Sequence, residues 1–146
     1  MGIINRDTDY AVRALCCMAG RGERIVPVTE LVKALKIPRP FLRKILQRLN
    51  KRRLLASFKG HGGGFMINAD PDRIFLIDLI RIFQGRFSLN ECVFKKEICP
   101  NKKTCLLKKK MDGIEKLVLA ELKTITIGSL LKGRIPHGKT QDNQNR

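Results

Sequence analysis

The sequence predicts a mainly α-helical fold with one small β-hairpin and a long helix in its C-terminal part. Three observations lead to this prediction. Apolar residues recur at helical spacing in several segments. Two short runs of β-forming residues, at 54–59 and 65–68, are separated by a glycine cluster. Nine Lys or Arg residues and no Asp or Glu lie between Lys36 and Lys59, which concentrates positive charge directly before that cluster.

Two helices are predicted before the basic segment. The first is expected from Asp7 to about Arg21, where nearby glycines end it. Its core-facing side is formed by Tyr10, Ala11, Ala14, Leu15 and Met18. Asp7, Thr8 or Asp9 is expected to cap its N-terminus, because a short polar side chain accepts a hydrogen bond from a free backbone amide. A β-branched run at 25–28 then leads to a second helix at 29–35.

The third predicted helix begins at Arg39 and is amphipathic. At about 100° per residue, one arc contains Phe41, Leu42, Ile45, Leu46 and Leu49. The opposite half-circle contains Arg39, Arg43, Lys44, Gln47, Arg48, Asn50 and Lys51. Pro40 suits the first helical turn, and Pro38 favours an extended chain before it. Three helices followed by a hairpin make the order of a winged helix-turn-helix.

The charge balance indicates a polyanionic partner, double-stranded DNA. The chain has a net charge of +17 over 146 residues, more than solubility requires. Arg39 and Arg43 are the predicted base contacts. The predicted phosphate contacts are Arg48, Lys51 and Lys59, and the remaining members of the DNA-binding set are Lys44, Gln47, Gly60 and His61. His61 is either a minor-groove contact or a solvent-exposed turn residue.

After the hairpin, a short apolar helix is expected at 76–83 and a long helix from Cys105 to about Lys123. The long helix carries one apolar stripe, formed by Leu107, Met111, Ile114, Val118 and Leu122. A small module needs two copies to read a palindrome, so we predict that the stripe is a homodimer seam. The expected divisions are a DNA-binding module at 1–85, a cysteine loop at 86–105, a dimerisation helix and short terminal helix at 106–132, and a disordered tail at 133–146.

Three of the five cysteines, Cys92, Cys99 and Cys105, lie in a polar loop that also holds four lysines. Nearby cations favour thiolates, so metal or redox chemistry is the predicted use. Cys16 and Cys17 lie inside the first predicted helix and are expected to be buried, inert thiols. Neither a membrane-spanning run nor a signal-peptide pattern is found in the sequence, which predicts a cytoplasmic protein without disulfides.

The chain resembles the Rrf-type family of bacterial winged-helix regulators over about residues 3–132. The matching marks are the segment 9–15, the basic helix 41–49, the glycine-rich wing 59–65, the three cysteines and the segment 125–128. The resemblance implies a dimer that crosses its long C-terminal helices. It also implies an iron–sulfur cluster, held by Cys92, Cys99 and Cys105, that controls DNA binding.

The fourth cluster ligand is expected to differ between branches of this family. Members with a [2Fe–2S] cluster have a His three residues after the last Cys, where this chain has Lys108. Members with a [4Fe–4S] cluster use an Asp of the other subunit near the start of the first helix, and Asp9 matches that position. The resemblance therefore favours [4Fe–4S]. Asp9 as a helix cap, and Glu91 or Glu97 as the ligand, remain alternatives.

The predicted function is a homodimeric transcription regulator, usually a repressor in this family, that senses nitric oxide, iron or redox state. A cluster-independent or zinc-bound regulator, a small iron–sulfur electron carrier and a zinc-stabilised RNA-binding protein are the alternatives. One Tyr and no Trp leave few stacking platforms for RNA. No enzyme and no small-molecule substrate are predicted, because the sequence has no paired-carboxylate, nucleophile–base or phosphate-loop pattern.

Overall fold

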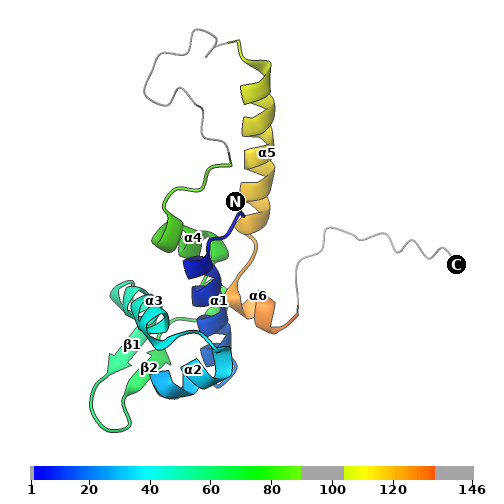
Figure 1. Cartoon of the computed structure of the whole chain (residues 1–146). Coiled ribbons are helices and arrows are strands. Elements are labelled where there is room, and N and C mark those ends of the chain that lie inside the picture. The colour runs from blue at the N-terminus through cyan, green and yellow to red at the C-terminus, as the bar shows by residue number, and fades with distance from the viewer. Residues whose placement is uncertain (1, 90–103, 134–146) are drawn as a thin grey trace, which may run out of the picture.

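The computed structural model describes residues 2–89 and 104–133, and its mainly helical architecture with one antiparallel hairpin matches the predicted fold class (Figure 1). The elements in order are α1 (Arg6–Ala19), α2 (Val28–Leu35), α3 (Arg39–Lys51), β1 (Leu55–Phe58), β2 (Gly64–Ile67), the 3-10 helix η1 (Pro71–Arg73), α4 (Leu76–Gln84), α5 (Leu106–Leu122) and α6 (Ile127–Leu131). The first four helices, the hairpin and α6 form one body, from which α5 projects. The predicted tail at 133–146 lies outside the described residues beyond Gly133.

The start of α1 corrects the predicted cap. Asn5 has extended backbone angles, and its side-chain oxygen accepts a hydrogen bond from the Thr8 amide at 2.8 Å. Asp7, Thr8 and Asp9 therefore lie inside the helix. Asn5 is the better placed residue because its side chain reaches the amide three residues ahead. Thr8 is fully buried and donates its hydroxyl hydrogen to Gln84 Oε1 at 2.7 Å.

The main core forms where α1 meets α3 and the hairpin. Four of the five apolar residues predicted for the inner arc of α3 are at most 1% exposed: Leu42, Ile45, Leu46 and Leu49. Phe41 differs, with 45% exposure and the Arg6 guanidinium carbon 5.2 Å from its ring centroid. Phe41 lies in the first turn of α3, which extends past the core.

The hairpin is short and is held to the start of α2 by one extra bridge. Leu55 pairs with Ile67 and Phe58 with Gly64. Val26 exchanges two backbone hydrogen bonds with Phe65, at 2.7 and 3.0 Å. The β-branched run at 25–28 thus contributes a single bridge residue, because α2 already begins at Val28. At Gly64, a Cβ atom would lie 2.3 Å from the Val26 carbonyl oxygen, so only glycine allows this approach.

Only the C-terminal part of α5 is packed on the body. Leu122 is buried with Leu76, Ile77, Ile80 and Phe87. Elsewhere α5 exposes large apolar side chains: Leu106 by 75%, Leu107 by 70%, Ile114 by 47% and Leu117 by 71%. Backbone hydrogen bonds from Leu76 to Ile125 and from Ile127 to Ile74, both 2.9 Å, then fasten the chain between α5 and α6 to the body. The base of α5 is therefore fixed, while two of the five residues of its predicted stripe, Leu107 and Ile114, are exposed.

Two glycine substitutions test this description of the wing and of α5. Gly64→Ala is expected to lower the free energy of unfolding by about 1–3 kcal/mol, because the methyl group forces Val26 and the hairpin apart. Gly113→Ala is the matched control. Apart from the backbone of its own helix turn, no atom of the described residues lies within 4 Å of its Cβ position, and alanine favours the helix by about 1 kcal/mol. Urea unfolding monitored by circular dichroism measures both, and equal effects would contradict the close approach at Gly64.

Candidate nucleic-acid interface

The outer side of α3 and the wing enclose a cationic groove. Arg39, Arg43, Lys44, Gln47 and Lys51 are exposed on α3, and Lys59, Gly60 and His61 are exposed on the wing. The groove between them has a volume of about 490 Å³ and is lined in part by Arg39, Arg43, Gln47, Lys59 and Gly60. The structure thus brings together five of the nine predicted DNA contacts around one hollow.

The exposed cations of α3 and the wing lack acidic partners. Within residues 2–89 and 104–133, no ion pair is formed by Arg39, Arg43, Lys44, Lys51 or Lys59. By contrast, Arg21 and Arg24 both bind Glu30, at 2.7 and 2.6 Å. The hydrogen bond from Arg24 lowers the pKa of Glu30. Arg39, Arg43 and Lys59, the cations that line the groove, are therefore without an acidic partner inside the described chain.

The wing contributes exposed glycine backbone as well as positive charge to this surface. Gly60 and Gly62 have positive φ angles of 86° and 72°, and the Gly63 amide donates to the Gly60 carbonyl at 3.0 Å. These angles suit glycine, whose missing side chain also lets a ligand approach the backbone closely. Lys59 and His61 flank Gly60, so one tight turn presents a cation and an imidazole beside bare backbone.

The sequence did not predict that the start of α2 lines the same groove. Pro27, Val28 and Thr29 form this wall, and α2 has no side-chain cap on its first amides. Helix N-termini favour anions. The helix–turn–helix order itself was the available signal, because it places the second helix beside the third.

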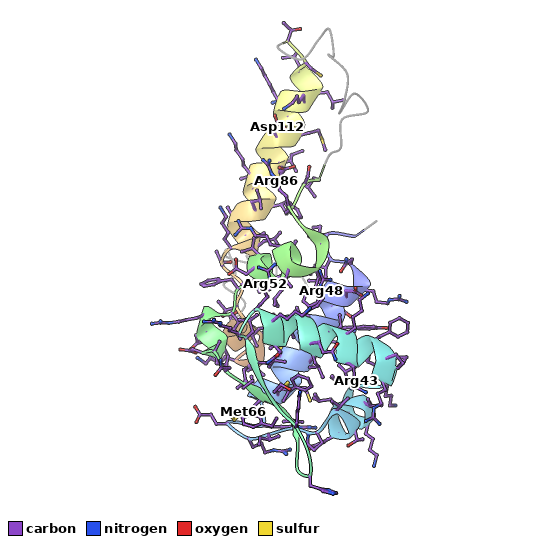
Figure 2. The ribbon with its side chains drawn as sticks, turned by 90° about the vertical axis from the view of Figure 1, so that its left-hand side faces the viewer. Arg43, Arg48, Arg52, Met66, Arg86 and Asp112 are labelled. Carbon is purple, nitrogen blue, oxygen red and sulfur yellow. The ribbon has the colours of Figure 1, made fainter. Side chains whose placement is uncertain are left out.

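Arg48 lies apart from the other predicted contacts. Its Nη2 donates to the Ile82 carbonyl oxygen at 3.0 Å, and its guanidinium carbon lies 5.1 Å from the centroid of the Phe83 ring. Figure 2 shows Arg48 between α3 and α4, whereas Arg43 lies on the opposite side of α3. The free guanidinium expected for a phosphate contact is thus engaged within the protein.

The predicted cluster ligands are only partly covered by the structure. Cys92 and Cys99 lie outside the described residues. Cys105 is half-buried and caps α5, with its sulfur accepting a hydrogen bond from the Lys108 amide at 3.4 Å. Asp9 binds Arg13 Nε at 2.9 Å and is 46% exposed. No group of three metal-binding side chains occurs in the part of the chain that the structure describes.

Cys105 and Asp9, the two predicted donors in the described chain, are chemically compatible with an iron–sulfur cluster. A sulfur that accepts an amide hydrogen bond at a helix N-terminus is suited to carry negative charge. Lys108 Nζ is 2.6 Å from Asp112 Oδ2, so this side chain is held as an ammonium in an ion pair and offers no lone pair to a metal. Asp9 is accessible once it releases Arg13. These contacts leave Cys105 and Asp9 as ligand candidates and argue against Lys108.

The remaining cysteines of the described chain do not form a site. Cys16 and Cys17 are half-buried in α1. Burial, with a smaller effect from the neighbouring Cys17, raises the pKa of the Cys16 thiol, which keeps it protonated and unreactive. Among the described helices, none is long and apolar enough to span a bilayer.

Comparison with known proteins identifies the family. The model of the Rrf2 family, described as "Iron-dependent Transcriptional regulator", matches residues 4–133. A protein of Aquifex aeolicus (strain VF5), whose name places it among HTH-type transcriptional regulators, is 33% identical over 84% of this chain and 86% of its own. The HTH-type transcriptional regulator NsrR of Bacillus subtilis (strain 168) is 26% identical over 87% of this chain and 88% of its own.

A solved structure agrees with the fold. The structure of CymR, the global cysteine regulator of B. subtilis, matches with a TM-score of 0.72 and 22% identity, and covers 91% of this chain and 98% of that one. At this identity the likeness shows the winged-helix fold alone. The family match over residues 4–133 shows that the chain belongs to the Rrf2 family of transcriptional regulators.

Proposed function

We propose that this regulator is a homodimeric DNA-binding repressor whose DNA affinity is controlled by an iron–sulfur cluster. The cationic groove between α3 and the wing, without acidic partners of its own, is the observation that carries the DNA-binding part. A basic helix and a β-hairpin are the two elements that enter or follow DNA grooves. In the proposed complex α3 enters the major groove and the wing follows the adjacent minor groove.

Within this complex, base reading and phosphate binding fall to different side chains. Arg39 and Arg43 lie on the groove side of α3 and have the two parallel donors that match a guanine edge. Gln47, one turn after Arg43, suits adenine. Lys44, Lys51 and Lys59 are compact cations for phosphates, while Gly60 and His61 approach the minor groove.

A homodimer is supported by the exposed apolar residues of α5. Leu107 and Ile114 belong to the predicted stripe and stand 70% and 47% exposed. Exposed apolar patches on a projecting helix mark an interaction surface. A second copy of α5 buries this surface and sets two copies of α3 at the spacing of a palindromic operator.

The cluster is proposed to be held by Cys92, Cys99 and Cys105, with Asp9 of a second copy as the fourth ligand of a [4Fe–4S] group. Such a cluster supplies chemistry that responds to nitric oxide, iron or oxidation. The Asp9 carboxylate is paired with Arg13, so a metal bound to Asp9 would compete with this ion pair, and gain or loss of the cluster would change the charge pairing at the start of α1. Since α1 packs against α3, the proposed signal reaches the DNA-binding helix.

Substitutions on the two kinds of DNA contact are expected to differ. Arg43→Ala should cost about 1–3 kcal/mol on an operator selected from random duplexes and relax one base preference. Lys59→Ala should weaken all duplexes alike and reduce the salt slope by about one. Fluorescence anisotropy at several salt concentrations separates the two results. A wild-type protein with no preferred duplex, with or without cluster, would refute the proposed regulator.

The cluster is tested by purification without oxygen. The wild-type protein should absorb near 400 nm and contain roughly four iron and four sulfide ions per chain. Cys99→Ser should lose most of both, whereas Cys16→Ser, in α1, is the control and should keep them. Asp9→Ala should lower cluster retention. Colourless wild-type protein containing zinc would instead support the zinc-bound regulator, and iron whose oxidation leaves DNA affinity unchanged would support the electron carrier.

The dimer is tested on α5. Ile114→Asp places a charge in the proposed seam and should weaken self-association roughly tenfold or more, because the carboxylate must be desolvated. Lys116→Asp, two residues further along α5, is the control, since it points to the other side of the helix and should leave the dimer intact. Sedimentation velocity across a concentration series measures both variants. Equal dissociation constants for the two variants would count against this seam.

A further inference from the structure

The last turn of α4 has a partner on α3. The final four carbonyls of a helix lack intrahelical donors, and Ile82 is one of these residues in α4. Arg48 supplies the missing donor at 3.0 Å while its guanidinium lies over the Phe83 ring. A cation at this end also meets the negative end of the helix dipole. Arg48 therefore caps α4 from a neighbouring helix.

The same turn of α4 is held on its other side by Gln84. Its Oε1 accepts hydrogen bonds from the Asn5 amide at 2.9 Å and from the Thr8 hydroxyl at 2.7 Å. Its Nε2 donates to the Ile3 carbonyl at 3.2 Å. The end of α4 is thus tied to the first turn of α1 as well as to α3, which makes it a fixed base for Arg48.

We propose that Arg48 is a positioning residue for DNA reading, which sets how α3 is presented to the major groove and does not bind phosphate itself. Arg48 lies five positions after Arg43, a turn of about 140° around the helix, and Figure 2 shows them on opposite sides of α3. If the face of α3 that carries Arg48 shifts relative to α4, the opposite face, which carries Arg43, therefore changes its direction. This inference rests on the proposed DNA binding.

Helix α4, to which Arg48 binds, contributes to both apolar clusters of the molecule. Leu79 and Phe83 belong to the main core with α1 and α3. Ile77 and Ile80 belong to the second cluster, which includes Leu122 of α5. One helix thus packs on both the DNA-reading part and the base of α5. Arg48 is the hydrogen-bonded link through which a shift of α4 is passed to α3.

Arg48→Met removes the capping donors and keeps an unbranched side chain. On the selected operator its affinity should fall about tenfold, comparable to losing one base contact, while affinity for random duplex should match that of Arg81→Met. Arg81 is an exposed arginine of α4 and calibrates the loss of one charge. The salt slopes of the two variants on random duplex should agree. Arg48→Lys, which retains a donor and the charge, should recover part of the operator affinity.

Other results would overturn the inference in distinguishable ways. A salt slope that falls by about 0.9 more for Arg48→Met than for Arg81→Met would show a phosphate contact. A lower melting temperature with unchanged operator preference would show a purely structural role. If Arg48→Met does not fold, Phe83→Leu, which keeps every charge, must reproduce the loss of preference. A wild-type protein without any preference would refute the proposed function as well.

Discussion

The structure depends on the burial of one face of α3. Leu42, Ile45, Leu46 and Leu49 are each at most 1% exposed, and burying such side chains contributes about 1.5–3 kcal/mol apiece. Because this arc must face α1 and β1, the basic residues of α3 must face outward. The cationic surface therefore follows from the packing of the core. The wing completes it only because glycine at position 64 allows the hairpin to contact Val26.

The features that depend on residues close together in the sequence were predictable from it. The inner arc of α3 and the glycine turn between the strands follow from residue order within a few positions, so both were predicted with nearly the observed ends. The cap at Asn5, the exposure of Phe41 and the engagement of Arg48 were not. The cap at Asn5 is a local contact of its own side chain with the Thr8 amide, two residues before the earliest predicted cap. The exposure of Phe41 and the engagement of Arg48 depend on where a second element lies: the core boundary for Phe41 and the end of α4 for Arg48.

The candidate site shows the same division. Charge and helix periodicity identified the side chains of the groove. A helical projection, however, cannot tell which of the outward-facing arginines are free and which contact another element. Only the packed structure separates Arg43, which lines the groove, from Arg48, which binds the Ile82 carbonyl. It also adds the start of α2, whose residues carry no basic side chain at 27–29 that would have drawn attention.

The exposed part of α5 connects the three proposed properties. Only the C-terminal part of α5 packs on the body, and Gly113 lies near the middle of the helix. In the proposed dimer, a second copy would cover the apolar side chains that its N-terminal half exposes. Cys105 caps this end of the helix, so the proposed dimer contact and a proposed cluster ligand would lie on one element. The base of α5 packs on α4, which Arg48 joins to α3. The proposed dimer contact and the proposed cluster ligand would thus be connected to α3, the proposed reading helix, through contacts that the structure contains.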